Sequence, residues 1–115
     1  MLSSDDIRRL ALEYPETHEF RHFGIPAFRV GKRACAGFDK GGRTAVFSVS
    51  EDEGSAAVVA DPIVYQEVWR NGATTSWVGL RVDLTAATEE LVHELIDHAW
   101  RNKALKRVVA AYDAR

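Results

Sequence analysis

Four short runs of β-favouring residues lie between Glu19 and Val49, and glycine-containing turns separate them. The runs are residues 19–23, 27–31, 33–38 and 43–49. The separating segments are Gly24-Ile25-Pro26, Gly31-Lys32 and Asp39-Lys40-Gly41-Gly42. Short runs of this kind, bounded by glycine and proline, are typical of strands joined by turns. The pattern therefore predicts an antiparallel meander of four strands.

A helical pattern precedes the meander. Ser3 or Ser4 can cap a helix whose first turn carries Asp5 and Asp6, because carboxylates suit the positive end of a helix dipole. Pro15 ends the pattern. The apolar positions have the spacing i, i+3, i+4, i+7 and are Ile7, Leu10, Ala11 and Tyr14. We expect an amphipathic helix with one buried face.

Further helices are predicted after the meander. Ser50 and Glu53 have the spacing of a capping box, and Asp61-Pro62 ends the helix that they begin. Thr85 or Thr88 starts a third helix, whose buried stripe is Leu91, Val92, Leu95, Ile96 and Ala99. A short fourth helix carries the stripe Leu105, Val108, Val109 and Tyr112.

One more strand is predicted between the second and third helices. Residues 76–84 alternate, with Val78, Leu80, Val82 and Leu84 on one face and Trp77, Gly79, Arg81 and Asp83 on the other. The preceding residues, 63–76, fit a short strand and an irregular segment equally well. The prediction for this region is a strand with one face in the core.

The order of these elements predicts an α+β fold. Layer packing places the helices on one face of an antiparallel sheet, so we expect a two-layer single domain over residues 1–115 with its other sheet face partly open. Apolar residues make up 46% of the chain and charged residues 28%, which is average globular usage and excludes a disordered chain.

The chain has the features of a soluble cytoplasmic protein. No apolar run approaches the ~18 residues that span a bilayer, and acidic residues stand near the N-terminus where a signal peptide needs positive charge. Cys35 is the only cysteine, so no disulfide can form within the chain. We expect no membrane partner, and a monomer or a weak homodimer.

Several segments resemble MmcQ/YjbR-like proteins. The most specific is residues 22–32, HFGIPAFRVGK. Further pieces follow the family order over nearly the whole chain: Arg9-Leu10-Ala11-Leu12, Asp61-Pro62, Trp77-Val78-Gly79, Ala99-Trp100-Arg101 and Lys106-Arg107-Val108-Val109-Ala110-Ala111. One departure is Lys103-Ala104-Leu105-Lys106, where relatives usually have Ala-Pro-Lys. It favours a more continuous junction between the last two helices.

The resemblance implies a compact α+β fold in a double-wing arrangement, and it implies DNA as a partner. It brings no catalytic residues and no cofactor. We therefore expect a non-enzymatic binding protein, and we assign no catalytic residue. Fold alone does not settle function, so the individual side chains carry the remaining argument.

The histidines do not have the spacing of a metal site. His93 and His98 lie five residues apart on a predicted helix, about 140° around its axis. His18 and His22 lie roughly 13 Å apart along a regular strand. Neither pair can share one ion, so no metal is expected.

Basic residues are concentrated in the meander and are the main indication of DNA binding. Residues 21–44 hold six basic residues and one acidic residue, although the whole chain has a net charge of −2. Cations at exposed turns can contact phosphates, and such contacts are weak and salt-dependent. Charged turns also serve solubility alone. The candidate nucleic-acid-binding residues are Arg29, Lys32, Arg33, Lys40 and Arg43.

The open sheet face is a second candidate surface. The predicted alternation turns Trp77 and Arg81 outward, and His22 and Phe23 line a groove beside them. A tryptophan beside arginines suits base stacking, and it suits a protein interface equally. Packing of Trp77 under the C-terminal helices is the third alternative. The competing hypothesis is therefore a module that binds a protein or a small ligand around His22, Phe23, Trp77 and Arg81.

Overall fold

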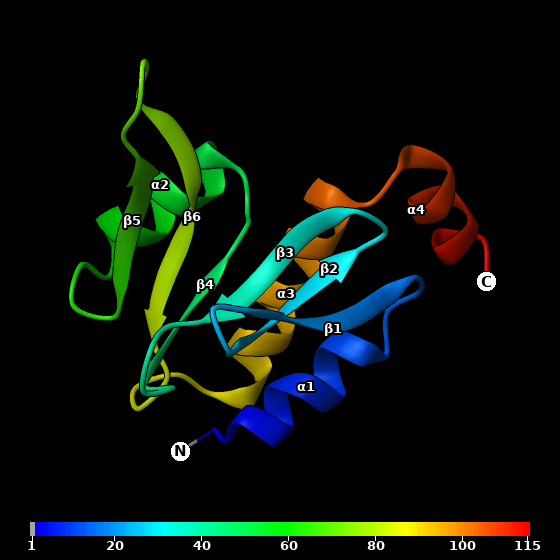
Figure 1. Cartoon of the computed structure of the whole chain (residues 1–115), viewed down its shortest axis with the longest axis horizontal. Coiled ribbons are helices and arrows are strands. Elements are labelled where there is room, and N and C mark those ends of the chain that lie inside the picture. The colour runs from blue at the N-terminus through cyan, green and yellow to red at the C-terminus, as the bar shows by residue number, and fades with distance from the viewer. Residues whose placement is uncertain (1) are drawn as a thin grey trace.

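Six strands form one antiparallel sheet in the order β1-β2-β3-β4-β6-β5 (Figure 1). The structure is a computed structural model and describes residues 2–115. Within this range the strands are β1 (Thr17–His22), β2 (Ile25–Val30), β3 (Arg33–Phe38), β4 (Thr44–Phe47), β5 (Tyr65–Arg70) and β6 (Ser76–Asp83). The helices are α1 (Ser4–Leu12), α2 (Glu51–Ala60), α3 (Glu89–Lys103) and α4 (Lys106–Asp113). The predicted α+β fold is confirmed.

Helices α1, α2 and α3 cover one face of the sheet, and the core lies between helices and strands (Figure 1). Helix α1 packs on β1, α3 on β3 and β4, and α2 on β5 and β6. The largest fully buried side chains are Ile7, Phe28, Phe47, Val49, Leu80, Leu84, Val82, Val92 and Trp100. None of the helices within residues 2–115 is long and apolar enough to cross a membrane.

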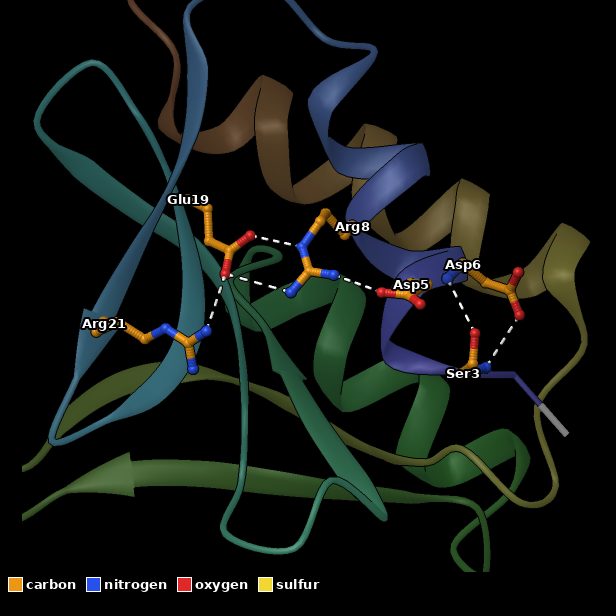
Figure 2. Close-up of polar contacts among 6 residues, drawn as sticks. All are labelled: Ser3, Asp5, Asp6, Arg8, Glu19 and Arg21. Carbon is orange, nitrogen blue, oxygen red and sulfur yellow. Dashed lines mark hydrogen bonds and ion pairs between the residues drawn. The ribbon is translucent and has the colours of Figure 1, made fainter.

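Helix α1 is fixed at its start and along its outer side (Figure 2). The Ser3 hydroxyl accepts a hydrogen bond from the Asp6 backbone N–H at 3.1 Å, and the Asp6 carboxylate accepts one from the Ser3 N–H at 3.0 Å. This is a complete capping box, with Ser3 as the cap. Arg8 donates from Nε to Glu19 of β1 at 2.6 Å, and Arg21 lies 3.8 Å from the same carboxylate. The ion pair joins α1 to the edge strand β1.

The turn between β1 and β2 is shorter than predicted. His22 pairs with Ile25, so the bend consists of Phe23 and Gly24, and the prediction of Gly24-Ile25-Pro26 is wrong. Both turn residues have positive φ, 52° for Phe23 and 78° for Gly24. Two such residues form the type I′ turn that matches the twist of a hairpin. Phe23 is 91% exposed, so a bulky side chain occupies a strained conformation at the tip without support from the core.

A β-bulge in β6 reverses the predicted direction of Trp77. Strand β5 forms within residues 63–76, where the sequence pattern fitted a strand and an irregular segment equally well. It pairs with β6, but the register shifts between Val68 and Trp69. Val68 lies opposite Gly79 and Trp69 opposite Trp77, so Val78 has no partner in β5. The extra residue places Trp77 on the helix-covered face. The prediction that Trp77 faces outward beside Arg81 is therefore wrong.

Trp77 packs against α2 rather than under the C-terminal helices. Its Nε1 donates to the backbone oxygen of Val49 at 2.8 Å. The indole ring covers Gly54 so closely that a Cβ atom there would lie 2.4 Å from two ring carbons. Gly54 is thus a contact site for the ring, although glycine weakens a helix.

Replacing Gly54 by alanine should destabilise the protein. Alanine normally stabilises a helix by about 0.5–1 kcal/mol, but here its methyl group displaces the Trp77 ring, and overpacking costs about 1–3 kcal/mol. Urea unfolding measures the difference. The double variant Gly54→Ala/Trp77→Leu should lose less than the sum of the two single variants. A Gly54→Ala protein as stable as the parent would contradict this packing.

Replacing Phe23 by asparagine should stabilise the protein. Asn-Gly is a favoured pair for a type I′ turn, and asparagine tolerates positive φ better than phenylalanine, so a gain of about 0.5–1 kcal/mol is expected. Thermal unfolding at a single pH measures it. The matched control Phe23→Leu keeps an apolar side chain and should give no gain. Equal stability of all three proteins would mean that the turn stores no strain.

Candidate functional site

The five basic residues predicted to bind DNA lie in three separate places. Lys32 lies in the β2–β3 turn and Arg33 is the first residue of β3, whereas Lys40 and Arg43 lie in the turn after β3. Because the six residues of β3 join the two turns, these turns lie roughly 20 Å apart, at about 3.3 Å per residue. Arg29 lies within β2, where its guanidinium stacks 3.8 Å above the centre of the Phe20 ring. The five side chains do not form one surface.

The turn that carries Lys40 and Arg43 also holds acidic side chains. Asp39 accepts hydrogen bonds from Thr44 at 2.6 Å and from Arg81 Nε at 2.9 Å. Hydrogen bonds from Thr85, assisted by the charge of Arg43, hold the pKa of Asp83 below its usual value. The positive charge at this end is therefore partly balanced by carboxylates.

The cations of the β2–β3 turn line a cavity together with cations of α3 and α4. Lys32 and Arg33 lie on one side of this cavity and the junction of α3 and α4 lies on the other. The cavity has a volume of about 330 Å³. We call this cavity the basic hollow. Its lining residues are Glu16, Val30, Gly31, Lys32, Arg33, Lys103, Leu105, Arg107 and Val108. Four cationic side chains and one carboxylate thus line a single small space.

The break between α3 and α4 shapes the basic hollow. Ala104 and Leu105 are extended, with ψ values of 150° and 146°, so the prediction of a more continuous junction is wrong. The break places Lys103 at the end of one helix and Arg107 at the start of the next, on either side of the same cavity. Val30 and Val108 are buried beneath it and form an apolar floor.

Helix α4 is held in place by aromatic packing and ion pairs. The Tyr112 ring lies 5.5 Å from that of Tyr14 and 5.2 Å from that of Trp100. Arg101 donates to Asp97 on its own helix at 2.8 Å and to Asp113 of α4 at 2.9 Å. These contacts fix the angle between α3 and α4 and, with it, the width of the basic hollow.

The positive charge of the basic hollow is only partly neutralised. Glu16 lies 3.7 Å from Arg107 and is the one carboxylate in the lining. Burial, together with the nearby charge of Arg33, lowers the pKa of Lys103. Leu105, at the N-cap of α4, offers no side-chain acceptor to the first N–H groups of the helix. Cations and a helix N-terminus together favour an anion at this position.

The sequence pattern predicted two of these four cations, Lys32 and Arg33, and did not predict Lys103 and Arg107. Lys32 and Arg33 stand out because they occupy a turn in a basic segment. Lys103 and Arg107 lie 70 or more residues downstream and read as the polar side of a short helix. The departure of Lys103-Ala104-Leu105-Lys106 from the family pattern was the available signal.

A second cavity lies on the uncovered face of the sheet, and we call it the sheet hollow. It has a volume of about 280 Å³, and its lining includes Phe20, His22, Ile25, Ala27, Gly37 and Val78. Phe23 does not line it, although its ring lies 4.6 Å from the His22 ring, centre to centre. Arg81 is engaged with Asp39, which lines the rim. Of the four residues predicted for this surface, Trp77 lies on the opposite face.

Comparison with known proteins identifies a family for this chain. Among residues 2–115, no three histidine, cysteine or acidic side chains gather as a metal ion would require. Neither a curated protein nor a solved structure gives a significant match to the sequence. The model of the YjbR family matches residues 12–102, a range that runs from the end of α1 almost to the end of α3. The chain therefore belongs to the YjbR family.

Proposed function

We propose that this protein binds nucleic acid, and DNA in particular, through phosphate contacts at the basic hollow, without catalysing a reaction. The observation that supports the proposal is the convergence of Lys32, Arg33, Lys103 and Arg107 on one cavity. These side chains come from a hairpin turn, the end of one helix and the start of another. Charged side chains that serve only solubility need not gather at one cavity from distant parts of the sequence.

Phosphate groups are the part of DNA that such a surface can bind. Arginine and lysine provide only donors and fixed positive charge, which suit phosphate oxygens irrespective of base sequence. Because the whole chain has a net charge of −2, only this end of the molecule attracts the negatively charged DNA. Four phosphate contacts correspond to a slope of about −3.6 in a plot of log affinity against log salt concentration. Binding is therefore weak at physiological salt.

In this proposal the β2–β3 hairpin is one wing of the double-wing arrangement that the family resemblance implies. Its turn, at Lys32, contacts the backbone of the nucleic acid, and α4 contacts it beside the turn. The second basic turn, with Lys40 and Arg43, lies too far away to join the same contact. Arg29 remains stacked on Phe20 and takes no part.

Charge reversal at the hairpin turn tests the proposal. Lys32→Glu/Arg33→Glu should weaken binding to a DNA duplex at least about tenfold and make the salt slope shallower by about two, because two phosphate contacts are lost. Fluorescence anisotropy at several salt concentrations measures both values. Both replaced residues are exposed, so the fold should be retained.

The matched control is Lys40→Glu/Arg43→Glu, which changes the net charge equally at the other end of β3. In about 0.1 M salt the Debye length is about 10 Å, so this variant should keep most of the affinity. Equal losses in both variants would indicate attraction without a defined site. The proposal is wrong if the parent protein shows no binding at low salt.

A second candidate function is binding of a small ligand or a protein side chain in the sheet hollow. The observation in its favour is an apolar cavity on the uncovered sheet face with Arg70 and His22 at its edge. Among the described residues Arg70 has no ion-pair partner, so an aromatic carboxylate would suit the cavity.

Titration with 2-naphthoate tests this second candidate. The amide signals of Phe20, Ala27 and Val78 should shift in NMR spectra, and Arg70→Gln should weaken the effect several-fold because a charge-assisted contact is lost. Lys32→Gln, at the other cavity, is the control and should leave the shifts unchanged. Shifts confined to other parts of the molecule would contradict the assignment.

A further inference from the structure

We infer that the basic hollow binds a terminal phosphate monoester, carried by a nucleic-acid strand end or by a free nucleotide. The inference rests on the proposed nucleic-acid binding and specifies which phosphate group the site takes. It follows from the size of the cavity, the number of its cations and its apolar floor.

The size of the cavity favours one inserted group over a continuous strand. A volume of about 330 Å³ lies at the lower end of the range for small-molecule pockets, roughly 300–1,000 Å³. The four cations that line it come from the hairpin turn, from the end of α3 and from the start of α4. A duplex presents its phosphates one after another on a convex surface, so it can touch the rim but cannot bring several cations to one phosphate.

The number of cations favours a monoester over a diester. The lining contains four cations but only one carboxylate, Glu16, which lies 3.7 Å from Arg107. The cations are Lys32, Arg33, Lys103 and Arg107. A phosphodiester carries one negative charge, whereas a phosphate monoester carries about 1.5 to 2 at neutral pH and offers three terminal oxygens. A dianion is thus the better electrostatic match. It also offsets the burial of the Lys103 ammonium, which forms no ion pair with a carboxylate of residues 2–115.

The start of α4 lies beside the same space. Arg107 contributes its side chain to the lining and lies in the first turn of a helix whose N-cap residue provides no side-chain acceptor. Backbone N–H groups at a helix N-terminus are suitable phosphate donors. They supplement the four cations and are not needed to define the site.

The apolar residues of the basic hollow explain why a nucleotide suits it better than a bare anion. Val30 and Val108 form the floor, and Leu105 is 57% exposed at the edge. A sugar or base attached to the phosphate can cover this apolar surface. These three apolar side chains have no hydrogen-bonding groups that could distinguish one base from another. The site should therefore accept any base.

Oligonucleotides that differ only at their ends test the inference. The probes are a single-stranded DNA 12-mer with a 5′-phosphate, with a 3′-phosphate and with hydroxyl ends, together with dAMP and inorganic phosphate. We expect at least one phosphorylated 12-mer to bind about tenfold more tightly than the hydroxyl form. Amide signals of Gly31, Leu105 and Val108 should shift in NMR spectra when it binds.

Lys103→Met is the variant that separates this site from general attraction. Methionine has a similar volume and removes a partly buried charge, so the protein should fold at least as well as the parent. The variant should lose the preference for a phosphorylated end. Lys40→Glu/Arg43→Glu should keep that preference, because these residues lie at the other end of β3.

The outcomes distinguish the two proposals. Equal affinity for all three 12-mers, lowered by Lys32→Glu/Arg33→Glu, would overturn the monoester site and leave nucleic-acid binding intact. Binding of dAMP without binding of any oligonucleotide would overturn nucleic-acid binding and support a free nucleotide as the ligand. Inorganic phosphate that binds as well as dAMP, or signals that shift away from the basic hollow, would overturn the inference.

Discussion

The buried indole of Trp100 is the contact on which the helical layer depends. Its Nε1 donates to the backbone oxygen of Pro15 at 3.1 Å, just beyond α1. Its ring packs against those of Tyr14 and Tyr112, so one side chain of α3 contacts both the segment that follows α1 and the helix α4. Because α4 forms one wall of the basic hollow, the position of that cavity is a consequence of core packing. The cations at its rim need no mutual attraction to come together.

Local patterns in the sequence predicted most of the elements. Ser3, one of the two predicted caps, and the predicted pair Ser50 and Glu53 do mark helix starts, because capping involves residues only three positions apart. The turns at Gly31-Lys32 and at residues 39–42, and the alternation of residues 80–84, likewise depend on near neighbours. The direction of Trp77 was among the predictions that failed, because a bulge in β6 turns its indole onto Gly54, a residue of another element.

The candidate site was only half predictable for a related reason. Lys32 and Arg33 were found because a basic turn is a local feature. Lys103 and Arg107 join them only through the packing of α3 and α4 against the sheet, which no local pattern describes. The separation of the two basic turns, in contrast, follows from the meander itself. Consecutive turns of an antiparallel meander lie at alternate ends of the strands. Lys32 and Lys40, which occupy consecutive turns, must therefore lie far apart.

The acidic first turn of α2 gives the molecule an electric dipole. Glu51, Asp52 and Glu53 lie together there, and residues 45–69 contain five acidic residues and no basic one. Figure 1 places α2 and α4 at opposite sides of the molecule, so negative and positive charge are separated across its width. A polyanion repels one side and attracts the other, which rotates the protein during approach. Encounters would therefore be oriented before contact, even though the protein as a whole is weakly acidic.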